Sequence, residues 1–270
     1  MRQLRHIAMG TLATAMVVMV LVGCSSPRAT PNYESRCQDK GWADDIPGQE
    51  CVALLALHDS TGGDDWSNRT GWLSSSSPCE WHGISCKRGH VVSISLLSNQ
   101  LSGPVPAELG NLGALRILEL PYNQLTGTIP PELGNLGALV SLWLGDNKLT
   151  GSIPLELANL SALKVLDLHD NQLTGTIPPE LGNLGPLVSL WLGDNHLTGR
   201  IPLELGNLGA LKVLDLHHNQ LTGTIPPELG NLGALEVLLL HDNQLTGTIP
   251  SPLKRLCNTE PKCKSGQNIA

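Results

Sequence analysis

The chain has 270 residues, 15% of them charged, and a formal net charge of −7 at pH 7. This acidic balance gives no support to nucleic-acid binding, which needs a basic surface. The length fits one domain with caps at its ends and leaves little room for a second globular domain. Phenylalanine is absent, and the expected core is almost wholly leucine, isoleucine and valine. Such side chains suit a stack of short, similar strands.

The first 23 residues predict an export signal. Arg2 and Arg5 precede an apolar segment, residues 7–22, that is too short to be a comfortable membrane span. The segment ends in Leu-Val-Gly-Cys24, which resembles a bacterial lipoprotein signal. That resemblance implies cleavage before Cys24, acylation of this cysteine and a lipid-anchored protein on the outer surface or the periplasmic face of a bacterial membrane. An ordinary secretory signal is the alternative. Residues 24–36 are expected to form a short disordered tether.

Seven copies of a 24-residue unit occupy residues 91–258. Their skeleton is L-x-x-L-x-L-x-x-N-x-L-T-G-x-I-P-x-x-L-G-x-L-x-x, and its first eleven positions match the leucine-rich repeat signature. The T-G-x-I-P segment resembles the plant-type subfamily, to which receptor-kinase ectodomains and polygalacturonase-inhibitor proteins belong. We therefore expect an α/β repeat solenoid, a curved right-handed coil with a parallel β-sheet on its concave face and disulfide-closed caps.

Period-2 alternation assigns roles within each repeat. Positions 1, 4 and 6 point into the core, and positions 3 and 5 point outward on the concave face. The glycine at position 13 fits a tight bend, and the Ile-Pro pair begins the convex side in an extended conformation. Position 9 is always asparagine, whose amide can satisfy buried backbone groups as a structural ladder. These asparagines are Asn99, Asn123, Asn147, Asn171, Asn195, Asn219 and Asn243.

Residues 37–90 are predicted to form an N-terminal cap that covers the first repeat. The apolar run at residues 52–57 predicts a short helix, which ends before Gly62. The stretch resembles the plant-type repeat N-terminal domain, with which it shares an A-L-L-A-L run and a C-x-W-x-G-x-x-C loop. Trp66, Trp72 and Trp81 are expected in the cap core and not at a ligand. Residues 259–270 are expected to form the C-terminal cap and tail.

Six cysteines besides Cys24 lie at the two ends of the array, which agrees with disulfide staples in an oxidising compartment. Fifteen pairings are possible, and proximity in the sequence favours pairing in consecutive order. The six are Cys37, Cys51, Cys79, Cys86, Cys257 and Cys263.

The exposed strand positions predict a binding face. Position 5 reads, in order, Ser95, Glu119, Trp143, Asp167, Trp191, Asp215 and Leu239. Trp143 and Trp191 should lie roughly 10 Å apart, with Asp167 between them and Gly145 and Gly193 leaving room beside each ring. Two outward indoles suit stacking on sugar rings or peptide side chains. Duplication of a 48-residue segment is the alternative origin of the pair.

We expect the two indoles to anchor an extracellular protein, peptide or polysaccharide. The expected polar contacts beside them are Glu119, Asp167, Asp215, His169 and His217. Neither a nucleophile with a partnered base nor a phosphate-binding glycine loop is present, so no enzyme is predicted. A carboxylate pair of Glu119 and Asp167 would stand on a shallow exposed sheet, which is poorly suited to acid–base work.

Three alternatives remain. His217 and His241, flanked by His218 and Asp242, could share a metal ion, but such a row is more often a solvated polar face, so neither a metal nor a cofactor is predicted. The array could be a spacer or adhesin without a specific site. Repeated threonines at positions 12 and 14 could bind ice or a mineral surface. They are Thr126, Thr128, Thr174, Thr176, Thr222, Thr224, Thr246 and Thr248.

Overall fold

The computed structural model describes residues 32–254 and 263–264. The expected signal peptide, the cysteine expected to be acylated (Cys24), most of the expected tether and Cys257 lie outside these residues. Within them no helix is long and apolar enough to cross a membrane.

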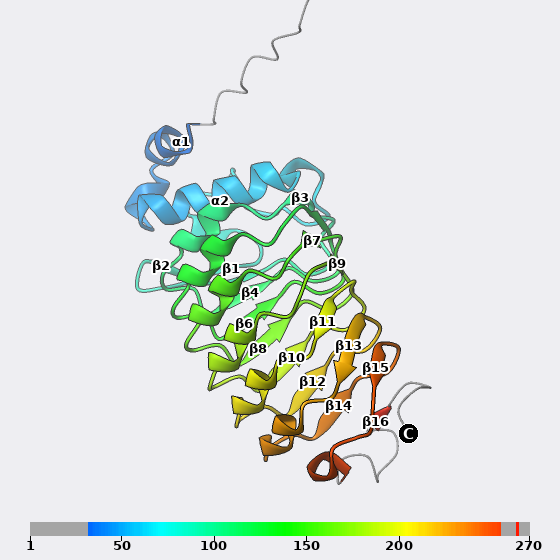
Figure 1. The fold of residues 1–270 in the computed structure, drawn as a ribbon. Coiled ribbons are helices and arrows are strands. Elements are labelled where there is room, and N and C mark those ends of the chain that lie inside the picture. Colours follow the sequence, from blue (N-terminus) through cyan, green and yellow to red (C-terminus); the bar gives the residue numbers. More distant parts are fainter. Residues whose placement is uncertain (1–31, 255–262, 265–270) are drawn as a thin grey trace, which may run out of the picture. The chain divides into compact units, whose positions relative to one another are not determined.

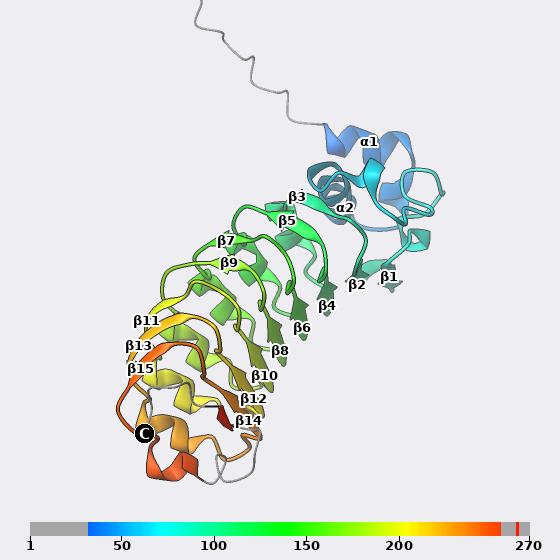
Figure 2. The same ribbon diagram turned by 90° about the vertical axis from the view of Figure 1, so that its right-hand side faces the viewer.

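The repeats form one continuous curved sheet along the inner side of a solenoid (Figures 1 and 2). Its first two strands pair antiparallel, and every later described strand is parallel to its neighbour. From the second strand to the eighth, the paired residues occupy equivalent positions of successive repeats, whereas the last strand pairs one residue out of this register. The order of strands is β1 (Ile84–Lys87), β2 (His90–Ser95), β4 (Ile117–Glu119), β6 (Ser141–Trp143), β8 (Val165–Asp167), β10 (Ser189–Trp191), β12 (Val213–Asp215), β14 (Val237–Leu239) and β16 (Cys263–Lys264). The predicted repeat solenoid is confirmed.

A second set of short parallel strands runs along another side of the solenoid (Figure 2). These strands were not expected, because segments of two to five residues give no clear alternation of side chains. Its strands are β3 (Ser102–Pro104), β5 (Gln124–Thr126), β7 (Thr150–Gly151), β9 (Gln172–Leu173), β11 (Thr198–Arg200), β13 (Gln220–Thr224) and β15 (Gln244–Thr246).

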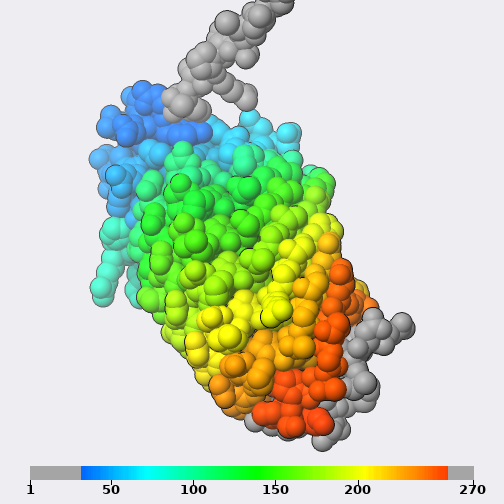
Figure 3. All heavy atoms as spheres, in the orientation of Figure 1, coloured from blue at the N-terminus to red at the C-terminus, as the bar shows by residue number. Residues whose placement is uncertain are grey.

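The convex side consists of one short 3₁₀ turn in each repeat. Each turn follows a proline with extended backbone angles, as the Ile-Pro pair predicted, and the segment is too short to develop a full α-helix. The turns are η4 (Ala107–Asn111), η5 (Pro131–Asn135), η6 (Leu155–Asn159), η7 (Pro179–Asn183), η8 (Leu203–Asn207), η9 (Pro227–Asn231) and η10 (Ser251–Leu253). In a space-filling view the repeats follow one another as bands in chain order (Figure 3).

The core is a leucine stack crossed by the asparagine ladder. Leucines at positions 1, 4 and 6 are almost fully buried, and each buried side chain contributes about 1.5–3 kcal/mol. The Asn147 amide shows the ladder at work: its Nδ2 donates to the carbonyls of Leu120, Leu144 and Gly145 at 3.0–3.1 Å. Its Oδ1 accepts from the Leu125 amide at 2.9 Å. The side chain therefore joins two repeats, and the predicted structural role is confirmed.

Position 8, just before the asparagine, has a left-handed backbone in every repeat. The φ angle there lies between +46° and +56° at Ser98, Tyr122, Asp146, Asp170, Asp194, His218 and Asp242. Aspartate, asparagine and histidine are enriched in this conformation, whereas a bulky side chain is unusual. The column of aspartates in this place thus has a conformational cause.

The N-terminal cap begins earlier than the sequence indicated. Helix α1 (Tyr33–Asp39) includes residues that were assigned to the disordered tether, and the Asn32 side chain caps it by accepting from the Ser35 amide. Helix α2 (Gly48–Ser60) contains the expected helical run and extends it. Disulfides join Cys37 to Cys51, which ties α1 to α2, and Cys79 to Cys86. Both predicted N-terminal pairings are confirmed, whereas the pairing of Cys257 with Cys263 falls partly outside the described residues.

Tryptophans fill the cap interior, as expected. Trp66, Trp72 and Trp81 are at most 5% exposed, and Trp42 joins them. Trp66 and Trp72 pack edge-to-face with ring centroids 4.8 Å apart, an arrangement that aromatic quadrupoles favour.

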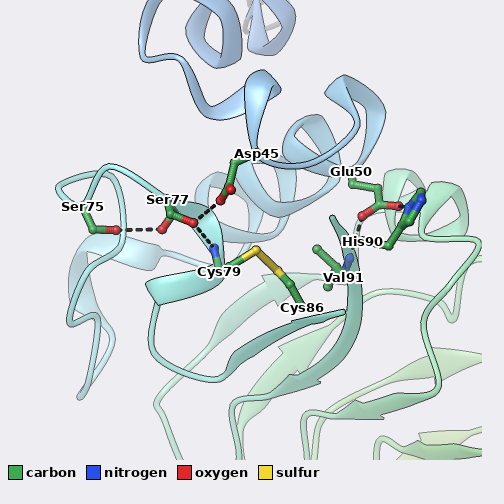
Figure 4. The surroundings of a disulfide bond; sticks show 8 residues. All are labelled: Asp45, Glu50, Ser75, Ser77, Cys79, Cys86, His90 and Val91. Carbon is green, nitrogen blue, oxygen red and sulfur yellow. Dashed lines mark hydrogen bonds and ion pairs between the residues drawn. A yellow bond between two sulfur atoms is a disulfide. The ribbon is translucent and has the colours of Figure 1, made fainter. Parts of the chain in front are cut away.

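A buried carboxylate fixes the cap on the first repeat strand. Glu50 on α2 lies 2.7 Å from His90 Nδ1 and accepts from the Val91 amide at 2.7 Å. Near the second disulfide, the Ser77 hydroxyl bonds Asp45 and accepts from the Cys79 amide (Figure 4). The cap is thus joined to the array by specific polar contacts as well as by its apolar core.

Candidate functional site

The register of the large sheet places the predicted contact residues in one row. Glu119, Trp143, Asp167, Trp191 and Asp215 occupy the last positions of five adjacent strands, β4 to β12, and each is directly paired with the next. The predicted alternation of indoles and carboxylates across the sheet is therefore confirmed.

The carboxylates in this row are not free for a ligand. Asp167 and Asp215 are only 3% exposed, whereas Trp143 and Trp191 are half-buried. The prediction that both aspartates face solvent is wrong, because each lies between larger side chains on the neighbouring strands and is bonded to a histidine two residues later. The groups left for a partner are chiefly the indole faces.

Each buried aspartate binds the histidine of its own repeat. His169 Nδ1 lies 2.5 Å from Asp167 Oδ1, and its Nε2 forms an ion pair at 3.1 Å with Asp146 of the preceding repeat. His217 repeats this arrangement with Asp215 at 2.5 Å and Asp194 at 2.9 Å. The histidines therefore hold adjacent repeats together, in addition to lining the concave face.

The glycines at position 7 make room for these histidines. A Cβ on Gly145 would lie 2.5 Å from His169 Nδ1, and one on Gly193 would lie 2.3 Å from His217 Nδ1. Both distances are closer than real Cβ contacts allow. The expected free space beside each indole is thus occupied by the imidazole of the next repeat. The glycine of one repeat and the histidine of the next therefore fit each other at both places.

Hydrogen bonding to Asp167 raises the pKa of the His169 imidazole to about 9, although burial opposes the shift. Burial raises the pKa of the Asp146 carboxyl, and His169 opposes that change. His169 is therefore cationic near neutral pH and neutralises part of the surrounding negative charge.

A hollow of about 230 Å³ lies over the indole row. Trp143, Trp191, Asp167, Asp215 and His169 line it, as do two residues that the sequence analysis missed, Pro121 and Tyr122. Two predicted residues lie outside its lining: Glu119, whose Oε2 accepts from the Ser95 hydroxyl at 2.7 Å, and His217, which is held by Asp215 and Asp194.

Tyr122 carried a signal that was overlooked. It occupies position 8, where four of the other repeats carry aspartate, and it adopts a φ of +56°. Its side chain is 58% exposed. A bulky aromatic residue is strained in a left-handed conformation, and this one gains no burial in return. Its place at the rim of the hollow suits contact with a partner.

Three imidazoles gather beyond the hollow, at the end of the same face. The ring centroids of His217, His218 and His241 lie 4.9–5.5 Å from one another. With Asp194 and Asp242 they form two sets of three residues whose side-chain atoms could hold a metal ion.

Comparisons with known proteins agree with this architecture. A family model described as a leucine-rich repeat region matches residues 90–259, and a leucine-rich repeat N-terminal domain matches residues 47–87. Among curated relatives, LRR receptor-like serine/threonine-protein kinase FEI 2 of Arabidopsis thaliana is 47% identical over 45 residues, which are 16% of this chain and 8% of that protein. The chain thus spans a small part of this relative. The matched regions are repeat and cap, and neither is a catalytic domain.

Solved structures give the same architecture over a longer stretch. The PEPR1–AtPEP1 complex has a TM-score of 0.70 at 34% identity, over 81% of this chain and 31% of that one. The Arabidopsis receptor kinase HAESA, solved with the peptide hormone IDA and the co-receptor SERK1, has a TM-score of 0.64 at 34% identity, over 81% and 42%. A plant ice-binding protein has a TM-score of 0.68 at 28% identity, over 83% and 79%.

The contacts of His169 with Asp167 and Asp146 predict that the stability of the protein depends on pH. Because its folded pKa of about 9 exceeds the unfolded value of 6.5, its stabilising contribution is complete below pH 6.5 and is lost as pH rises through 9. Asp167→Asn should return the imidazole pKa toward 6.5 and flatten this decline, as followed by NMR titration and by urea unfolding at pH 6, 7.5 and 9.

Asp170→Asn is the matched control. It should lower the His169 pKa less, because Asp170 has the smallest effect of the three carboxylates on this imidazole. If the pKa of His169 in the wild-type protein lies near 6.5, its contacts with Asp167 and Asp146 do not form in solution.

Proposed function

The chain belongs to the leucine-rich repeat family, and on that premise we propose that it is an extracytoplasmic recognition module. Its partner is an extended peptide segment of a protein, bound on the concave face. The observation that carries the proposal is the half-buried pair Trp143 and Trp191, which flanks a hollow on a face otherwise built of paired polar groups. Buried aromatic anchors dominate the binding energy of protein interfaces.

The chemistry of the hollow favours an apolar side chain of the partner. Asp167 and Asp215 are bonded to histidines, so they offer little to a ligand cation. Two indoles and the Tyr122 ring provide flat apolar surface. The volume of about 230 Å³ is below the range of pockets for drug-sized molecules. It suits one or two side chains of a peptide that continues along the sheet.

A peptide partner is also supported by the neighbours, since HAESA was solved with a peptide hormone. A polysaccharide is the competing ligand, because the face repeats every 48 residues. A spacer or adhesin without a specific site is the third possibility, and one experiment separates the three.

Replacing both indoles by alanine should abolish binding. Each of Trp143→Ala and Trp191→Ala is expected to weaken affinity by roughly 30-fold, which corresponds to a loss of about 2 kcal/mol at an aromatic anchor. The measurement is a screen of the folded chain on peptide and glycan arrays, followed by titration of the best ligand.

Leu203→Ala is the control, because Leu203 is 54% exposed and begins a turn of the convex side. It should leave affinity unchanged, and circular dichroism should confirm that all variants remain folded. A ligand bound equally by the double tryptophan variant would reject the concave site, and ligands confined to glycans would reject the peptide.

We further propose that Cys24 carries a lipid anchor. The basic start, the short apolar run and the cysteine that follows them support this proposal, and more than one acyl chain is needed for stable anchoring. Intact mass of the mature protein should show acylation at Cys24, and Cys24→Ala should move the protein from the detergent phase to the aqueous phase. An unmodified mature N-terminus elsewhere would contradict it.

A second function, ice binding through the threonine strands, is supported by two observations. Position 12 is threonine in six consecutive repeats, and the hydroxyls of Thr150, Thr198, Thr222 and Thr246 donate to a glycine carbonyl one repeat earlier at 3.2–3.3 Å. These hydroxyls are therefore held in register at the strand spacing. One structural neighbour is described as a plant ice-binding protein.

Thermal hysteresis tests this second function. Thr126→Lys combined with Thr174→Lys should abolish any activity, because two charged side chains would interrupt the regular exposed row. Trp143→Ala should leave the activity intact, since that residue lies on the large sheet. If the wild-type protein shows neither thermal hysteresis nor inhibition of ice recrystallisation, ice binding is excluded.

A further inference from the structure

We propose that Asp194, His217 and His218 form a binding site for one divalent transition-metal ion, with Zn²⁺ the best match. Asp194 follows strand β10, and the two histidines follow strand β12 on the neighbouring repeat. One ligand atom from each residue lies within 4.8 Å of the other two. None of the three ligand residues lines the hollow over the indoles, although Asp215 beside His217 does, and the proposed ion binding does not require the proposed peptide binding.

The two imidazoles already face the Asp194 carboxylate. Asp194 Oδ1 lies 2.7 Å from His218 Nδ1, and its Oδ2 lies 2.9 Å from His217 Nε2. Around a tetrahedral zinc ion with bonds of ~2.0–2.1 Å, ligand atoms lie roughly 3.3 Å apart. Each imidazole nitrogen is therefore within a fraction of an ångström of ligand spacing from the carboxylate oxygen that it faces.

A buried second carboxylate prepares His217 as a ligand. Its Nδ1 faces Asp215 Oδ1 at 2.5 Å, and Asp215 is 3% exposed. This contact fixes the ring, and Nε2 is directed toward Asp194. Metal-binding histidines commonly donate their second ring N–H to such a carboxylate, which fixes the tautomer and makes the ligand more basic.

The site appears where the chain departs from its own repeat pattern. Residues 139–186 and 187–234 are near copies that differ at six positions, one of which is Asp170 in the first copy and His218 in the second. Asp146, Asp167 and His169 hold the same arrangement in the first copy. The first copy thus has every part of the site except the second imidazole.

Nitrogen and oxygen ligands select the ion. Two imidazoles and a carboxylate suit Zn²⁺ and related divalent ions, whereas Ca²⁺ and Mg²⁺ prefer sets of oxygen atoms. His218 is half exposed and Asp194 is partly exposed, so water or a partner group can take the fourth position.

A neighbouring set competes for His218. Its Nε2 pairs with Asp242 Oδ2 at 2.8 Å, and the same oxygen lies 2.6 Å from His241 Nδ1. Asp242 and His218 are both about half exposed or more, and this set has no buried carboxylate comparable to Asp215. We therefore assign the ion to the set with Asp194.

Zinc titration by calorimetry, on full-length folded protein freed of metal with a chelator, tests the assignment. Wild type should bind one ion at this site, and His218→Asp, which converts the second copy to the sequence of the first, should weaken that binding at least tenfold. Asp215→Asn should weaken it by about 10–100-fold by releasing His217. Circular dichroism checks that each variant is folded.

The converse change is the sharpest control. Asp170→His gives the first copy its second imidazole and should raise the stoichiometry by one ion. His241→Gly, which introduces the residue that the third and fifth repeats carry at this position, should leave affinity within about twofold. The proposal is overturned if wild type and His218→Asp bind zinc alike, if neither binds it, if Asp170→His gains no ion, or if His241→Gly loses the site.

Discussion

The array depends on one side-chain amide in each repeat. Where the chain leaves the inner strand it turns sharply. Backbone bonds between successive turns, such as that from the Asp146 amide to the His169 carbonyl at 3.0 Å, pair part of the buried polar groups, and further groups of the turn are left to side chains. The position-9 asparagine satisfies them, and Asn147 reaches Leu120 and Leu125 in the repeat before it as well as its own turn. Because an unsatisfied buried polar group costs about 1–3 kcal/mol, this ladder allows leucines to stack without interruption. It also sets the common register that brings position 5 of every strand into a single row.

Most of the fold could be predicted because each repeat is constrained in the same way by its neighbours. Apolar spacing indicated the buried leucines, the asparagine column indicated the turn, and the cysteines of the cap indicated the pairs that form. The start of the cap was placed too late because α1 is a short polar helix whose single deeply buried residue, Cys37, gives no periodic pattern. The small outer strands were missed for a similar reason. These segments become strands only by pairing with the next repeat, and the sequence of a single repeat does not show that pairing.

The candidate site was predictable in outline but not in its accessibility. The repeat period correctly predicted that Trp143, Asp167 and Trp191 lie side by side, because equivalent residues of successive repeats pair on adjacent strands. It could not show that Asp167 would be buried, because burial depends on His169 folding back from the next turn. Nor could it connect Gly145 with that imidazole one repeat away. The duplicated 48-residue unit is thus a structural unit in its own right, and its side chains are explained first by how two repeats fit and only then by any ligand.

The left-handed backbone at position 8 has a consequence for the composition of this rim. Most side chains are strained in that conformation, and five of the seven repeats carry aspartate or serine there. An acidic border on such a protein can accordingly arise from torsional preference alone, and its charge is a poor guide to what the protein meets. Tyr122 departs from this pattern: it adopts the left-handed conformation while remaining exposed, and it lines the hollow over the indoles.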